Sequence, residues 1–149
     1  MMISPVREED LPDLLPLLRG YCDFYEVAPR DEQLLALCRA LLADPHREGI
    51  QLLARDEPTG GAVGFATLFW SWTTLSAGPL AVMNDLYVAP GARGTGTADA
   101  LIAACREHAR DHGAVRLEWQ TAKDNLRAQK VYERAGADRS EWIDYGLAP

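Results

Sequence analysis

The chain joins a strand, a glycine-rich turn and the start of a helix in one stretch, Leu86-Tyr87-Val88-Ala89-Pro90-Gly91-Ala92-Arg93-Gly94-Thr95-Gly96-Thr97-Ala98-Asp99-Ala100-Leu101. The apolar start predicts the end of a strand, and the glycines predict a turn. Apolar residues then recur at helical spacing, which predicts a helix over about residues 97–112. Because the first backbone N–H groups of a helix lack partners, this turn is a candidate anion site.

Three phosphate-binding patterns compete for this turn. A Walker A loop requires a lysine where Thr97 stands, and a dinucleotide-binding fingerprint requires a small residue where Asp99 stands. An acid beside a pyrophosphate is unfavourable, and the turn comes late in the chain, after antiparallel strands. The third pattern is Arg/Gln-x-x-Gly-x-Gly/Ala, which Arg93, Gly96 and Ala98 satisfy. We therefore prefer the third pattern.

Periodicity and turn residues predict the elements on either side of the turn. Before it we expect a strand at 2–6, a helix closing at 21–26, a helix at 31–42, and a meander of strands at 50–54, 62–74 and 80–88. After the 97–112 helix we expect a strand at 115–121, a helix at 125–135 and a last strand at 142–147. The order β-α-α-β-β-β-α-β-α-β predicts a single domain over residues 1–149, of α/β (α+β) class. We expect a mixed, mostly antiparallel sheet of about six or seven strands flanked by about four helices.

A second motif lies about one helix and one strand after the turn. It reads Asn125-x-x-Ala128-x-x-Val131-Tyr132-Glu133-Arg134-Ala135-Gly136-Ala137. Together with the Arg93–Ala98 pattern, it resembles the GNAT superfamily of N-acetyltransferases, whose element order is also the one predicted here. Tyr25-Glu26, the run 83–88 and the run 134–137 resemble the diamine (spermidine/spermine) acetyltransferase-like subgroup.

The resemblance implies acetyl-CoA (coenzyme A) as the cofactor. Within the family, the strand before the turn holds the pantetheine arm, the turn holds the pyrophosphate, and one face of the late helix lines the pantetheine. The implied cofactor-binding residues are Leu86, Tyr87, Val88, Arg93, Gly94, Thr95, Gly96, Thr97, Ala98, Asp99, Asn125 and Ala128. The backbone N–H of Leu86 is the implied donor to the developing oxyanion.

Acetyl transfer to an amine requires a base, because an ammonium has no lone pair, and an acid for the leaving thiolate. The resemblance implies that Tyr132 is the acid. The base is open, because Asn84 stands where diamine acetyltransferases carry a glutamate. The candidates are Asp85, Glu118 and Glu26; successive strand residues point to opposite faces, so Asp85 serves directly only if a bulge re-aims it.

The resemblance places the acceptor pocket between the first two helices and the fourth and fifth strands. Its implied residues are Tyr25, Glu26, Asn84, Trp119 and Gln120. Acids and aromatic rings suit a cationic amine. Trp70 and Trp72 share a strand face and line either this pocket, the core or a dimer interface. His108 and His112 show no useful metal spacing, so we expect no metal site.

Charge and cysteine content limit the classes of partner and the cellular compartment that we expect for this chain. The 149 residues carry a formal net charge of −7, which disfavours nucleic acid and favours a cationic small molecule. The three cysteines, Cys22, Cys38 and Cys105, suit buried free thiols in a reducing cytosol. Without an apolar leader or a stretch long enough to span a bilayer, we expect a cytoplasmic protein with no membrane contact.

The function predicted from these observations is acetyl transfer from acetyl-CoA to the primary amine of a small cationic acceptor, such as a polyamine or an amino acid. Two alternatives stay open: an acetyl-CoA-binding sensor or interaction module with little turnover, which Asn84 favours, and a protein-lysine acetyltransferase. The subgroup resemblance also implies a homodimer that exchanges C-terminal strands within residues 140–149.

Overall fold

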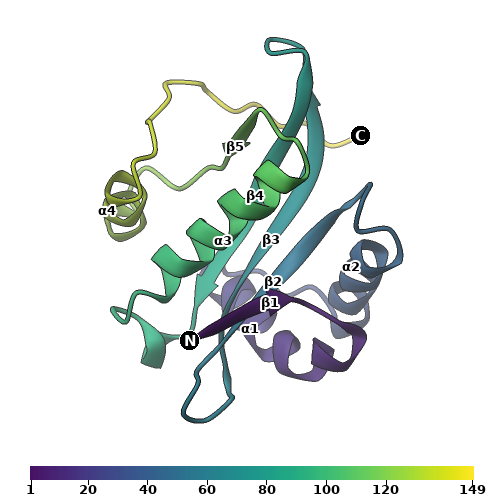
Figure 1. Ribbon diagram of the computed structural model, residues 1–149, viewed down its shortest axis with the longest axis vertical. Helices are drawn as coiled ribbons and strands as arrows, with labels where there is room; N and C mark the ends of the chain where they lie inside the picture. The colour runs from purple at the N-terminus through teal and green to yellow at the C-terminus, as the bar shows by residue number, and fades with distance from the viewer.

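The computed structural model describes residues 1–149, as one sheet with helices on both faces (Figure 1). The sheet order is β1-β2-β3-β4-β5. The strands are β1 (Met2–Pro5), β2 (Gly49–Arg55), β3 (Ala62–Thr73), β4 (Gly78–Val88) and β5 (Arg116–Glu118). The helices are α1 (Leu11–Phe24), α2 (Asp31–Ala43), α3 (Thr97–Asp111) and α4 (Leu126–Arg134), with short 3-10 turns η1 (Glu8–Asp10) and η2 (Pro90–Ala92).

The predicted element order is confirmed through the fourth helix, and the four helices are present, but the strand predicted after the last helix is absent. The strand predicted at 115–121 is reduced to Arg116–Glu118, and residues 142–147 form no strand. The sheet therefore has five strands. Apolar content alone predicted the last strand, but a strand also needs a paired neighbour, and β5 offers a ladder only three residues long.

Two apolar clusters, one on each face of the sheet, hold the helices. Alternating strand side chains divide between them, because successive residues point to opposite faces. Phe65 and Leu53 pack with α1 and α2, whereas Leu68 and Met83 pack with α3. The helices carry matching apolar stripes, for example Leu14 and Leu18 on α1.

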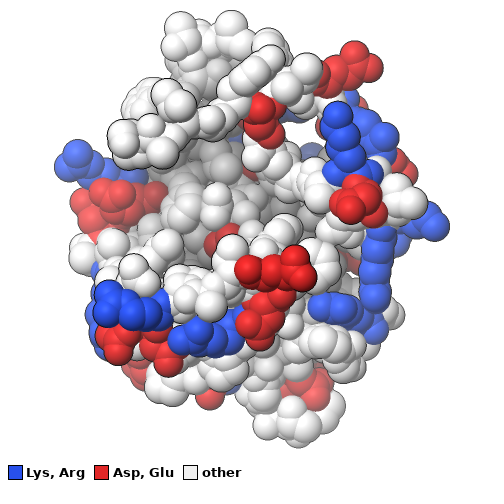
Figure 2. All heavy atoms as spheres, turned by 180° about the vertical axis from the view of Figure 1, so that it is seen from behind, with Lys and Arg blue, Asp and Glu red and all other residues white.

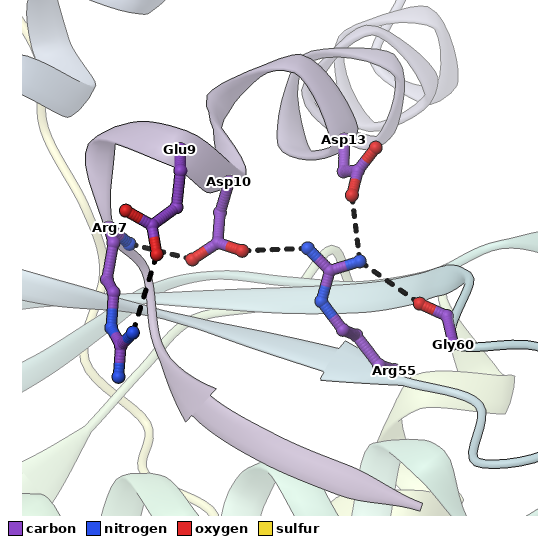
Figure 3. Close-up of polar contacts among 6 residues, drawn as sticks. All are labelled: Arg7, Glu9, Asp10, Asp13, Arg55 and Gly60. Atoms are coloured by element: carbon purple, nitrogen blue, oxygen red, sulfur yellow. Dashed lines mark hydrogen bonds and ion pairs between the residues drawn. The ribbon is translucent and has the colours of Figure 1, made fainter.

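The start of α1 is tied to the far end of β2 by Arg55 (Figure 3). Its guanidinium lies 2.7 Å from an Asp10 carboxylate oxygen and 2.8 Å from one of Asp13, and donates to the Gly60 carbonyl at 3.1 Å. Burial alone would raise the pKa of Asp10, but hydrogen bonds from the Arg55 side chain and the Arg7 backbone hold that pKa below its usual value. This anchor orients the helix whose other end reaches the site described below.

A β-bulge interrupts the ladder between β3 and β4. Thr67 pairs with Asp85 and Leu68 pairs with Met83, so Asn84 is an extra residue without a partner. A bulge re-aims the side chains that flank it. Asp85 consequently lies on the α1 side of the sheet, beside Tyr21 of α1, while its neighbour Leu86 packs on the α3 side.

The three cysteines are buried and unpaired, as predicted. Burial raises the pKa of Cys105 to about 12, so its thiolate form is scarce at neutral pH. None of the four helices is both long and apolar enough to cross a membrane.

Candidate active site

The turn after β4 presents its backbone to open space. Gly94 and Gly96 have φ angles of 83° and 86°, in the left-handed region that favours glycine. A Cβ added at either position would meet no atom within 4 Å. Ala100 is the first residue whose N–H bonds within α3, to the Gly96 carbonyl at 3.0 Å, and the N–H groups of residues 94–99 have no backbone acceptor. This arrangement fits a pyrophosphate.

Arg93 and the threonines of the turn shape its rim. The Arg93 Nε donates to the Val88 carbonyl at 3.0 Å, and the guanidinium carbon lies 5.9 Å from the Tyr87 ring centroid. The Thr95 hydroxyl donates to the Ala92 carbonyl at 2.7 Å and lies 2.9 Å from the buried Thr97 hydroxyl. Arg93 therefore brings a positive charge to the turn, while the threonines hold its conformation.

Strands β4 and β5 part beside this turn. They pair in parallel only from Leu80 to Val82, against Arg116 to Glu118. Beyond Val82, the chain after β5 turns away toward α4, and this edge of β4 has no strand partner (Figure 1). An extended ligand can pair with such an edge as an added strand. The segment Leu86–Val88, predicted to hold the pantetheine arm, lies on this edge.

Asn125, Ala128 and Tyr132 lie on α4 or at its start. They are across from the edge of β4 that β5 leaves unpaired. The Asn125 side chain accepts the Ala128 N–H at 3.2 Å, so it caps the helix. Tyr132 is half-buried, with its ring edge-on to Trp119 at a centroid distance of 5.3 Å. Burial, and then the nearby Tyr25, raise the pKa of Tyr132, against a hydrogen bond with Thr121 that lowers it. The phenol therefore keeps its proton at neutral pH and can donate it.

Asp85 sits in a polar network on the other face of the sheet. Burial raises its pKa, although hydrogen bonds with the Thr67 and Tyr21 hydroxyls and the Asn84 amide partly oppose the shift. The Asn84 amide donates to Asp85 Oδ1 at 2.9 Å, and Gln51 Nε2 donates to the Thr67 hydroxyl at 3.2 Å. A carboxyl whose pKa is moved toward neutrality is suited to exchange protons.

Tyr21 links this carboxyl to the end of α1. Burial, and then the charge of Asp85, raise the pKa of Tyr21, so its hydroxyl stays protonated. Its ring lies 5.0 Å from the Tyr25 ring and 6.0 Å from Phe65 between centroids. The two tyrosines therefore connect the exposed end of α1 to the half-buried Asp85.

The other two candidate bases are exposed. Glu118 forms an ion pair with Arg116 at 3.1 Å, and both side chains are about half exposed. Glu26 ends α1 in a left-handed conformation, with a φ of 56°, which is uncommon for a residue other than glycine. Asp85 is thus the candidate that combines burial with hydroxyl partners.

A hollow of about 430 Å³ lies between the end of α1 and the loop before α4. Its lining residues come from two distant parts of the chain: Phe24, Tyr25, Glu26, Ala122, Asp124 and Asn125. It thus combines two carboxylates with two aromatic rings. The molecular face opposite α3 is hollowed near its centre, and both acidic and basic side chains lie around the hollow (Figure 2).

The structure does not gather all the predicted acceptor residues. Trp119 packs with the α3-side cluster against Tyr132, on the same face as Leu117 two residues earlier, because successive residues of an extended chain point to opposite faces. Gln120 is exposed and donates to Asp144 at 2.6 Å. Trp70 stacks on His112 at 4.0 Å, and Trp70 and Trp72 line a different hollow.

Sequence reasoning missed four polar residues of this region: Tyr21, Gln51, Thr67 and Asp124. The one-turn spacing of Tyr21 and Tyr25 on a helix was a usable signal. No sequence pattern indicates that Thr67 lies opposite Asp85, because a bulge sets that register.

The parted strands beside an exposed helix start offer a place for an extended ligand that carries phosphates. Comparison with known proteins specifies the class. Residues 11–137 match the model of the acetyltransferase (GNAT) family. The chain is 31% identical over 136 residues to the uncharacterized N-acetyltransferase YhfO of Bacillus subtilis (strain 168), covering 91% of this chain and 89% of that relative.

Two further relatives agree. The thialysine N-epsilon-acetyltransferase of Bos taurus is 29% identical over 146 residues, covering 92% of this chain and 84% of that protein. A crystal structure of a probable acetyltransferase superposes with a TM-score of 0.87 at 33% identity, covering 100% of this chain and 98% of the other. The chain belongs to the GNAT family and is an acetyl-CoA-dependent N-acetyltransferase.

Proposed function

We propose that this enzyme acetylates the primary amine of a small cationic acceptor, such as a polyamine or a basic amino acid. The observation that carries the proposal is the hollow that joins Glu26 and Asp124 to aromatic rings at the end of α1. Carboxylates pair with an ammonium group, and aromatic faces attract it further. The bovine relative is a thialysine N-epsilon-acetyltransferase, which agrees with an amine acceptor.

Proton removal is assigned to Asp85, with Tyr21 between it and the hollow. The acceptor ammonium gives up one proton to the Tyr21 oxygen as the Tyr21 hydroxyl proton passes to the Asp85 carboxylate, which leaves a neutral amine. The raised pKa of Asp85 brings its proton affinity closer to that of a base working near neutral pH. Asn84 contributes a hydrogen bond to this carboxyl and takes no proton itself.

Acetyl-CoA supplies the acetyl group as an activated thioester. The groups that would hold it are the N–H groups of residues 94–99, which have no backbone acceptor, for the pyrophosphate, and the unpaired edge of β4 for the pantetheine. The backbone N–H of Leu86 is assigned to the developing oxyanion. Tyr132 is assigned to protonate the departing sulfur, since its raised pKa keeps the phenol protonated.

A thiol-release assay with mass spectrometry of the products tests the proposal. The purified enzyme is mixed with acetyl-CoA and a panel of polyamines, lysine analogues, amino acids and a histone-tail peptide. We expect saturable release and a mono-acetylated product with the small cationic amines. Acetyl-CoA binding by calorimetry without release for any acceptor would favour a binding module instead. Saturation by the peptide alone would favour protein-lysine acetylation.

Glu26→Gln and Asp124→Asn test the assignment of the acceptor hollow. Each change removes one carboxylate and keeps the size of the side chain. We expect each to raise the KM for the acceptor about tenfold and to leave the KM for acetyl-CoA unchanged. An unchanged acceptor KM in both variants would move the acceptor site elsewhere.

We also infer that the protein forms a homodimer through its C-terminal residues. Apolar side chains there are exposed, namely Trp142, Ile143, Tyr145 and Leu147. The short edge strand β5 lies open beside them in the sheet order. Exposed apolar side chains and an unpaired edge together favour strand exchange with a second copy. Light scattering that returns a monomer mass would overturn this inference.

A further inference from the structure

An ion pair with two parallel hydrogen bonds joins α3 to α4. Arg134 Nε donates to Asp99 Oδ1 at 3.0 Å, and Arg134 Nη2 donates to Asp99 Oδ2 at 2.7 Å. This is the bidentate geometry that planar guanidinium and carboxylate groups favour. The hydrogen bond from Arg134 holds the pKa of Asp99 below its usual value. Asp99 is therefore ionised at neutral pH and engaged by Arg134.

Asp99 lies where a second negative charge is expected to bind. It is the third residue of α3, in the first turn, next to the free N–H groups assigned to the pyrophosphate. A helix start favours one anion, but two anions at the same helix start repel each other. The positive charge of Arg134 offsets that repulsion. Without Arg134, Asp99 would weaken the binding of acetyl-CoA.

Helix α4 has few other attachments to the rest of the fold. It contains no buried residue, and its apolar contacts come from the half-buried Val131 and Tyr132. Gln129 binds the carbonyls of Ala122 and Lys123, in the loop that leads into α4. The Arg134–Asp99 pair is the only side-chain hydrogen bond or ion pair between α4 and another helix or strand.

We propose that Arg134 and Asp99 are positioning residues that couple the phosphate end of the cofactor site to the general acid. Arg134 neutralises Asp99 beside the N–H groups that would hold the pyrophosphate, and it also holds α4, with Tyr132 two residues earlier, in the position assigned to the general acid. The inference rests on the proposed role of Tyr132. The pair therefore has two separable effects. Its charge balance affects the binding of acetyl-CoA, and its tethering of α4 affects the position of Tyr132.

Four variants separate the two effects. Arg134→Gln leaves Asp99 uncompensated and α4 untethered, so we expect a KM for acetyl-CoA about tenfold higher and a kcat about tenfold lower. Two variants lack the carboxylate at position 99 that would repel the cofactor: Asp99→Asn, and the double variant Asp99→Asn with Arg134→Gln. Both should keep the wild-type KM for acetyl-CoA while kcat stays low. Arg134→Lys keeps the charge without the two parallel bonds, so KM is kept and kcat falls.

Glu133→Gln is the matched control. Glu133 neighbours Arg134 on the same helix, and its partner Arg139 lies 3.0 Å away in the chain just after α4. Its loss removes an exposed ion pair without freeing α4 from α3, so KM and kcat should both stay within about twofold. Equal kinetics for Glu133→Gln and Arg134→Gln would overturn the proposal. So would a double variant whose KM is as high as that of Arg134→Gln.

Two readouts do not depend on the acceptor or on turnover. Calorimetry of acetyl-CoA binding should reproduce the order of KM values across the variants. Hydrogen exchange should quicken in the α4 amides of Arg134→Gln and of the double variant, but not in those of Glu133→Gln. If wild type binds acetyl-CoA but acetylates nothing, the proposed function fails, and these two measurements still decide whether the pair couples α3 to α4.

Discussion

The two halves of the active site are built in different ways. The cofactor half comes mainly from one continuous stretch, in which β4, the glycine turn and the first turn of α3 follow each other along the chain. The acceptor half is assembled from the end of α1, the middle of β3, the bulge in β4 and the loop before α4. The first half offers its proposed ligand mainly backbone groups, whereas the second offers side chains.

This difference explains why one half can be altered without altering the other. Backbone N–H groups at a helix start can bind an anion with little help from side chains, provided that the turn keeps its glycines and no unpaired acid lies beside it. The acceptor half depends on side-chain identity and on the packing that brings distant segments together. Substitutions should therefore divide between effects on acetyl-CoA affinity and effects on acceptor chemistry, and four variants test that division.

The largest effect is expected for Asp85→Asn. Loss of the base should lower kcat about 1,000-fold and leave acetyl-CoA affinity unchanged. In wild type, kcat/KM should fall as the pH drops below the raised pKa of Asp85, because the protonated carboxyl accepts no proton. The variant should lose this acid limb. Steady-state pH profiles and calorimetry supply the measurements.

Unfolding does not account for such a loss. The folded-state pKa of Asp85 lies above its usual value, so its ionisation costs stability as the pH rises through that range. Asp85→Asn removes this cost and should be at least as stable as wild type at neutral pH. Glu118→Gln is the control, since that exposed acid pairs only with Arg116. A larger loss of kcat in Glu118→Gln would transfer the base to β5.

Gly96→Glu should weaken acetyl-CoA binding about 100-fold, which corresponds to about 2.7 kcal/mol. The φ of 86° is unfavourable for a residue with a Cβ, and the new carboxylate would face the pyrophosphate. Gly60→Glu is matched to it, with a φ of 70° and open space around the Cβ, but it lies in the turn between β2 and β3. Calorimetry should show near-normal affinity for Gly60→Glu, and equal affinities in the two variants would contradict the anion site.

Tyr132→Phe should lower kcat about 30-fold while changing the KM for acetyl-CoA by less than about threefold. The ring keeps its edge-on contact with Trp119, so only the hydroxyl is lost. This variant lies on the border between the two halves, because the pKa of Tyr132 responds to Tyr25 on the acceptor side. An unchanged kcat would remove Tyr132 from the role of acid.

The smallest effect on catalysis is expected for Arg55→Met, far from both halves. Loss of its bonds to Asp10 and Asp13 should lower the free energy of unfolding by about 1–2 kcal/mol, with kcat nearly unchanged. The low folded-state pKa of Asp10 stabilises the protein above its unfolded pKa and stops doing so as the pH falls through the folded value. The difference between wild type and Arg55→Met in the free energy of unfolding should therefore shrink below about pH 3.9, as measured by urea titration.

Arg7→Met serves as the control for that anchor. Arg7 pairs with Glu9 at 3.4 Å, and both side chains are about three-quarters exposed. Its loss should change the free energy of unfolding by less than about 0.5 kcal/mol. An equal loss of stability in both variants would mean that the partly buried position of Arg55 adds nothing to the strength of its ion pairs.

Most of the fold could be predicted from the sequence. Helix 31–42 was predicted within one residue of its observed end at Ala43, and helix 97–112 within one residue of Asp111. Glycines, prolines and amphipathic spacing are local signals, so they locate element ends without knowledge of the contacts. The strand predicted at 142–147 was wrong because strand formation requires a partner, which no local pattern supplies.

The cofactor half was predictable for the same reason. Its residues follow one another from Leu86 to Asp99, and their spacing alone indicates a strand, a turn and an exposed helix start. Trp119 shows the limit: it was placed with the acceptor, but it packs against Tyr132 on the α3 side. A shift of one residue along a strand moves a side chain to the other face of the sheet. Because β5 ends before Trp119, the strand pattern does not fix the face on which this side chain lies.

The sequence by itself determined the fold class, the family resemblance and the anion-binding turn, because these depend on neighbours along the chain. Only the tertiary structure supplies a reason to propose Asp85, rather than Glu118 or Glu26, as the base. That choice depends on the bulge at Asn84, on burial under α1 and on hydroxyls from Tyr21 and Thr67. Burial and long-range pairing set the proton affinity of a side chain, and residues far apart in the sequence create both.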